Sequence, residues 1–148
     1  MRTMIGRKFW WGVASVVTLW LLWMTLRPNP EVAASLQVLT TPAARHGIPY
    51  FWLIDIAGNI IVFAPLGAAV ALSVCTPRPV DVRILYGTLA GLLLSCTIEL
   101  LQGLTATRHA SLGDVALNTV GAALGAGVAI AMIQLINHQP GEDSCHTN

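Results

Sequence analysis

The chain has 148 residues, of which 55% are hydrophobic and 10% are charged. Soluble domains carry about 25% charged residues, so these few charges cannot cover a globule with a hydrated surface. The formal net charge of +1 gives no electrostatic footprint for nucleic acid. We therefore expect an all-α, polytopic membrane protein with a single domain.

Four apolar segments approach the 20 or so residues that a helix needs to cross the hydrocarbon core. They span residues 9–26, 53–74, 84–104 and 115–136. Polar stretches with Pro and Gly separate them, and the longest of these is 27–52. The polar segment 137–148 is expected to be a flexible cytoplasmic tail. The sequence thus predicts four transmembrane helices with a long loop after the first.

The first segment has a second interpretation, which is a cleaved signal peptide. Basic residues precede it, and Val32-Ala33-Ala34 resembles a cleavage site. However, its apolar run exceeds the usual h-region of about 7–15 residues. Two prolines, Pro28 and Pro30, also precede the cleavage site. We favour a retained helix.

Orientation follows from the Lys and Arg residues that flank the apolar segments. One side of the membrane receives five of them: Arg2, Arg7, Lys8, Arg78 and Arg83. The other side receives three: Arg27, Arg45 and Arg108. This bias predicts that both termini are cytoplasmic and that residues 27–52 and 105–114 face outward.

Six polar residues interrupt or border the last three apolar segments, and with this topology all six fall at the outer end. They are Asp55, Asn59, Glu99, Gln102, Asp114 and Asn118. The two residues of each helix are three or four positions apart, so each pair shares one helix face. We expect these faces to converge around one polar pocket, with Arg108 as the nearest cation.

Two interpretations of this cluster stay open. Polar side chains can join transmembrane helices simply by hydrogen bonding. Ionisable groups inside a membrane, however, are functional by default, and this interpretation is favoured. A catalytic role is less favoured because Ser111, flanked by His109 and Asp114 on one short loop, does not resemble a catalytic triad. We predict neither a metal site nor a cofactor.

Small residues and one proline shape the expected packing. The patterns Gly87-x3-Gly91 and Gly121-x3-Gly125 predict close helix contacts. Pro65 predicts a kink in the second helix. The echo of Asp55-Ile-Ala-Gly-Asn59 in Asp114-Val-Ala-Leu-Asn118 suggests a tandem duplication of helical hairpins.

The same residues carry a resemblance to the VanZ-like family of bacterial membrane proteins. It rests on Asn59-x3-Phe63-x-Pro65-Leu66-Gly67, Ser95-x2-Ile98-Glu99-x2-Gln102 and Arg108-x2-Ser111-x2-Asp114-x3-Asn118-Thr119-x-Gly121-x3-Gly125. It covers about residues 55–125, and outside them no motif aligns. The resemblance implies a bacterial plasma-membrane location and a link to low-level resistance to the glycopeptide teicoplanin.

Three functions compete. The favoured one is a cell-envelope protein that binds a lipid head group, a lipid-linked wall precursor or a lipoglycopeptide in the outward pocket. The second is an enzyme that modifies such a lipid, with Glu99 or Asp114 as general acid or base. The third is a structural subunit that uses its polar faces for assembly, and oligomerisation is left open.

Overall fold

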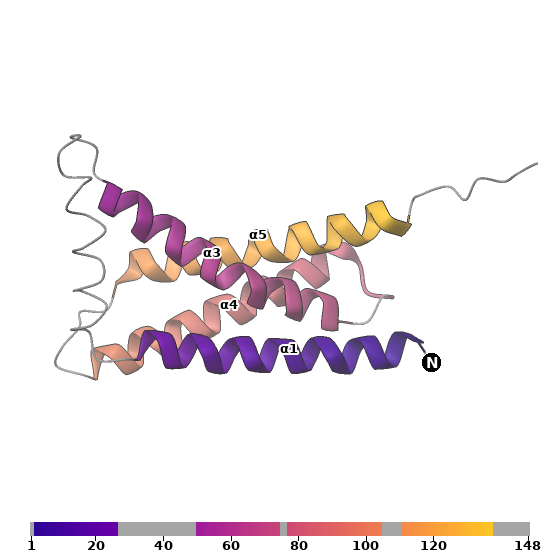
Figure 1. Cartoon of the computed structure of the whole chain (residues 1–148), viewed down its shortest axis with the longest axis horizontal. Coiled ribbons are helices and arrows are strands. Elements are labelled where there is room, and N and C mark those ends of the chain that lie inside the picture. Colours follow the sequence, from indigo (N-terminus) through magenta and orange to yellow (C-terminus); the bar gives the residue numbers. More distant parts are fainter. Residues whose placement is uncertain (1, 27–49, 75–76, 105–110, 138–148) are drawn as a thin grey trace, which may run out of the picture.

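The computed structural model describes residues 2–26, 50–74, 77–104 and 111–137, and these form four helices (Figure 1). They are α1 (Arg2–Thr25), α3 (Tyr50–Ser73), α4 (Val80–Gly103) and α5 (Leu112–Asn137). Each predicted apolar segment is therefore helical, and the all-α prediction is confirmed for the described residues. Most of the predicted outer loop and the tail beyond Asn137 lie outside them.

Three of the described helices are long and apolar enough to cross a membrane. The spans are Ile56–Ser73, Val80–Gly103 and Leu112–Ile136. The first helix, α1, was expected to be a fourth span and is not among these three. Its 24 residues reach about 36 Å, but it carries Arg7, Lys8 and four tryptophans, which contribute little hydropathy.

The tightest contact joins α5 to α3. Gly121 and Gly125 of α5 lie directly against the backbone of Ile60 and Ala64 of α3. In the same way, Gly67 of α3 lies against the backbone of Ala122 of α5. Because a side chain at these glycines would overlap a main chain, the interface depends on their small size, as expected where lipid gives no hydrophobic driving force.

The helix α4 packs across this pair. Gly87 lies against Gly67, where an added Cβ would be 2.6 Å from the carbonyl oxygen, and Gly91 lies against the side chain of Ala122. Both predicted glycine pairs are thus contact surfaces. Pro65 does not end α3, which continues through it to Ser73.

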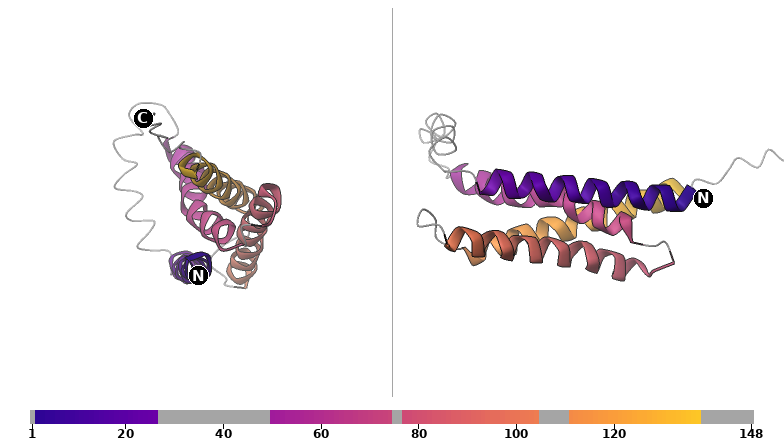
Figure 2. Two further views of the ribbon diagram at one scale, coloured as in Figure 1. Left: turned by 90° about the vertical axis from the view of Figure 1, so that its right-hand side faces the viewer. Right: turned by 90° about the horizontal axis from the view of Figure 1, so that it is seen from below.

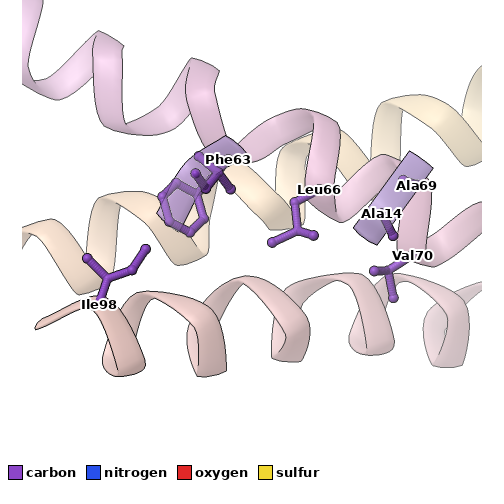
Figure 3. Close-up of a cluster of buried hydrophobic side chains, with 7 residues drawn as sticks. Ala14, Phe63, Leu66, Ala69, Val70 and Ile98 are labelled. Atoms are coloured by element: carbon purple, nitrogen blue, oxygen red, sulfur yellow. The ribbon is translucent and has the colours of Figure 1, made fainter. Parts of the chain in front are cut away.

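The core lies between α3, α4 and α1. Phe63 and Leu66 of α3 are 2% exposed, and they point toward the side of the bundle where Ile98 of α4 lies (Figure 3). Ala14 and Leu21 of α1 belong to the same cluster. α1 packs mainly against α3 and has few contacts with α4. It is therefore a peripheral helix of the bundle (Figure 2).

The helix directions gather four helix ends at one side of the molecule. Figure 1 shows the start of α3, the end of α4 and the start of α5 together, next to the end of α1. At the opposite side, Arg83 Nε donates to the carbonyl of Ala71 at 3.2 Å. This carbonyl belongs to the last turn of α3, where main-chain acceptors have no partner within the helix.

Candidate functional site

Glu99 is the carboxylate at the centre of the predicted cluster. It lies one turn from the end of α4 and is 8% exposed. Its Oε2 accepts the backbone N–H of Ser111 at 2.7 Å. This short, charge-assisted hydrogen bond joins α4 to the residue that precedes α5. The negative charge also lies at the positive end of the α5 helix dipole.

Ser111 is the N-cap of α5. Its Oγ accepts the backbone N–H of Asp114 at 3.3 Å, the usual bond from an N-cap to the third helical residue. In a complete capping box, the side chain at that third position would return to the N–H of the cap residue. Here Glu99 Oε2 accepts that N–H. A side chain of a neighbouring helix therefore completes the cap.

Asn118 lies two turns into α5 and is 5% exposed. Its Nδ2 donates to Ser95 Oγ of α4 at 2.9 Å, and Ser95 is fully buried. Asn118 Oδ1 is buried and has no hydrogen-bond partner among the described residues. An unpaired buried acceptor is uncommon in native structures and calls for an explanation.

Gln102 is 6% exposed and turns toward α1. Its Nε2 donates to the carbonyl of Thr25 at 3.0 Å. That carbonyl is in the last turn of α1, so the amide caps the C-terminal end of that helix. The predicted pocket was formed by polar faces of three helices, and α1 was not one of them.

The remaining predicted site residues are described less fully. Asn59 is half-buried on α3, and no hydrogen bond joins its side chain to another described residue. Asp55 lies in α3, but its side chain is outside the described part of the structure, as is all of Arg108. Pairing of Arg108 with Glu99 or Asp114 therefore stays a prediction.

The C-terminal end of α4 thus joins two other helices. Ser95, Glu99 and Gln102 share one buried face, and their partners are in α5, before α5 and in α1 respectively. The carboxylate meets a helix N-terminus, and an amide donor meets a helix C-terminus, which is the favourable polarity in each case. The two ends need these bonds because their main-chain groups have no partner within their own helices.

Sequence reasoning did not predict three of these hydrogen-bond partners, and only one of them carries a sequence pattern that indicates its role in the bond. Ser111-x-x-Asp114 before an apolar run is a capping-box pattern, which identifies Ser111 as a helix cap rather than a candidate nucleophile. Ser95 belongs to a motif on which the family resemblance rests, but a single serine in an apolar segment does not show which residue its hydroxyl bonds. Thr25 contributes its main-chain carbonyl, which no residue type reveals.

Apolar helices that are long enough to span a membrane, with buried hydrogen-bonded side chains near one end, define a multi-pass, α-helical membrane protein. Residues 10–135 match the VanZ/LLP1 family, and the chain therefore belongs to that family. The match extends beyond residues 55–125, on which the resemblance rested, and includes most of α1. No curated protein and no solved structure matches the chain.

Proposed function

We propose that this VanZ/LLP1 protein is an accessory protein of the bacterial cell envelope. It crosses the plasma membrane four times, with α1 as the additional span and both termini in the cytoplasm. Its outer polar cluster binds the head group of a lipid, a lipid-linked wall precursor or a lipoglycopeptide. The basic flank of α1 supports this orientation, because positive residues favour the cytoplasmic side.

The observation that carries the proposal is the buried carboxylate of Glu99. A charged residue inside a membrane helix is costly, by about 2.5–3.5 kcal/mol at the centre on insertion scales and by less near an end such as that of Glu99, and such residues are kept mainly where they act. Within the described part of the chain, Glu99 accepts one hydrogen bond. An ionised carboxylate can accept about four, so Glu99 retains acceptor capacity for a ligand.

The chemistry of this end of the bundle limits the ligand. Glu99 and Asp114 are acceptors when ionised, so the group they bind must donate hydrogen bonds, as an ammonium or a sugar hydroxyl does. Arg108 is the cation expected nearby, and a guanidinium suits a phosphate or carboxylate of the same ligand. Glu99 precedes the helix end by four residues, about 6 Å. That depth suits a molecule with a polar head and an apolar tail.

Charge neutralisation tests the proposal. Glu99→Gln keeps an acceptor for Ser111 but removes the charge, whereas Asp81→Asn makes the same change at an exposed position at the opposite end of α4. We expect Glu99→Gln to abolish the protein's effect on teicoplanin sensitivity at normal membrane abundance, and Asp81→Asn to have no effect. Arg108→Lys should behave like Glu99→Gln, because lysine lacks the planar fork of arginine.

A structural role is the second candidate, and the bonds from Glu99 and Gln102 to helix ends favour it. The same variants separate the two. If the phenotype falls only in proportion to membrane abundance, the cluster serves assembly. If Glu99→Gln retains full phenotype and full abundance, the ligand site proposed at Glu99 is wrong.

A further inference from the structure

The Asn118 side chain has an unused end inside the bundle. The residue is 5% exposed, and its Oδ1 has no hydrogen-bond partner among the described residues. The other end of the amide donates to Ser95 Oγ at 2.9 Å. One end of the Asn118 amide therefore has a hydrogen-bond partner and the other end has none. The two side chains are both buried, and they belong to different helices.

The orientation of the Asn118 amide decides which of its ends bonds to Ser95. The oxygen and nitrogen of an asparagine exchange places when the amide is turned, and a serine hydroxyl can either donate or accept. In the orientation of the structure the nitrogen bonds to Ser95. Oδ1 then has no partner in the described part of the chain, and it can accept a hydrogen bond from a further group.

The neighbouring helices limit the size and the chemistry of the group that can bond to Oδ1. The Asn118 backbone is close to Gly91 of α4, and one turn further along α5, Gly121 lies against Ile60 of α3. The contact of Gly121 with Ile60 is tight, the approach of Gly91 to the Asn118 carbonyl is an ordinary van der Waals contact, and neither neighbour offers a side-chain polar atom. The missing partner must therefore be small, and it must donate a hydrogen bond to Oδ1.

We propose that the unused end of the Asn118 amide binds a hydroxyl group, either of a buried water or of a lipid head group. A hydroxyl both donates and accepts, so it satisfies the amide in either orientation. Asn118 is six residues, about 9 Å, from the start of α5. At that depth the two sources of a hydroxyl are a lipid head group and a water that has entered from the outer end. The lipid source rests on the function proposed above, and the water source does not.

Nuclear magnetic resonance of the full chain in lipid nanodiscs tests the proposal. The chain has five asparagines, so selective labelling of asparagine side-chain nitrogen gives few signals, and Asn118→Gln assigns the one that matters. Discs of phosphatidylglycerol offer head-group hydroxyls, and discs of phosphatidylcholine offer none. The amide protons of Asn118 are examined for cross-relaxation with water and with glycerol protons.

Each outcome is decisive. Cross-relaxation with a bound water in both lipids supports the proposal with water as the source. Contact with glycerol protons in phosphatidylglycerol alone supports it with lipid as the source. Absence of both contacts in both lipids overturns it. Because no envelope phenotype is measured, failure here leaves the test of the proposed function untouched.

Stability gives a second measurement. The double variant Ser95→Ala, Asn118→Leu removes both polar partners while keeping the volume roughly constant. An empty site predicts an unchanged or raised Tm, because two buried polar groups have been replaced by apolar ones. An occupied site predicts a Tm lower by about 3 °C or more, because the bound hydroxyl loses its partners. Thr119→Val is the control, since that hydroxyl donates only within α5, to Val115 at 2.7 Å. An unchanged Tm in the double variant would contradict the proposal.

Discussion

The carboxylate of Glu99 accepts the backbone N–H of Ser111 at 2.7 Å, so a side chain near the end of α4 completes the cap at the start of α5. The same Ser111 caps α5 through its own hydroxyl, at 3.3 Å from the Asp114 nitrogen. These two bonds join the end of α4 to the start of α5, at the end of the bundle where the polar residues gather. The bond to Ser111 depends on the acceptor oxygen of Glu99.

Replacing Glu99 with leucine should weaken the start of α5. The substitution leaves the Ser111 N–H without its partner, which costs about 1–3 kcal/mol for a buried group. Glu99→Gln should cost less, because its amide oxygen can still accept that bond. Hydrogen exchange of the first-turn amides of α5 measures the effect. Equal exchange in the leucine variant and the unmodified chain would mean that this bond does not hold the helix end.

Gln102 should control how firmly the end of α1 is held. Gln102→Leu removes the donor to the Thr25 carbonyl, and Gln102→Glu adds a repulsion by placing carboxylate oxygens beside a carbonyl oxygen. We expect the glutamate variant to loosen α1 more than the leucine variant does. Distances between spin labels on the exposed residues Met24 and Leu104 measure the separation. A broader distance distribution for leucine than for glutamate would contradict this expectation.

Two glycines of α5 form a matched pair. An added Cβ at Gly125 would overlap the main chain of Ala64, whereas at Gly127 it would meet nothing within 4 Å. Gly125→Ala should therefore force α3 and α5 apart and destabilise the protein by about 1–3 kcal/mol, as overpacking does. Gly127→Ala should leave stability unchanged or slightly raised. Unfolding in mixed micelles compares the two, and equal losses would show that close α3–α5 contact is not the cause.

The sequence identified the helices and the small-residue contacts because both depend on local composition. Runs of apolar residues of the right length could only be membrane helices or buried core helices. Gly121 and Gly125 recur four residues apart, which places them on one face before any neighbour is known. The alternating direction of successive spans then collects the polar residues at one end.

The partners of those polar residues could not be obtained in the same way. A helix that is apolar all round has no polar face that fixes its rotation toward one neighbour. Gln102 could therefore face α3, α5 or α1, and it turns to α1. Arg108 was expected to pair with Glu99 or Asp114 or to bind an anionic ligand, and it lies outside the described residues. Among the described residues the partner of Glu99 is a main-chain N–H, which has no sequence signature.

Reporter fusions test the predicted topology, including the contribution of α1. The helices α3, α4 and α5 make three crossings, an odd number, so the predicted outer loop at 27–49 and the tail at 138–148 must lie on opposite sides whatever α1 does. Alkaline phosphatase inserted in the loop should be active, because the enzyme folds only outside the reducing cytoplasm. Green fluorescent protein at the C-terminus should be fluorescent.

The decisive fusion is green fluorescent protein at the N-terminus. If α1 crosses the membrane, the basic flank with Arg7 and Lys8 is cytoplasmic and this fusion fluoresces. If α1 lies along the outer surface, the N-terminus shares the side of the loop, and the fusion is dark while the phosphatase stays active. A dark N-terminal fusion at normal abundance would therefore reject the fourth span and leave the three apolar ones in place.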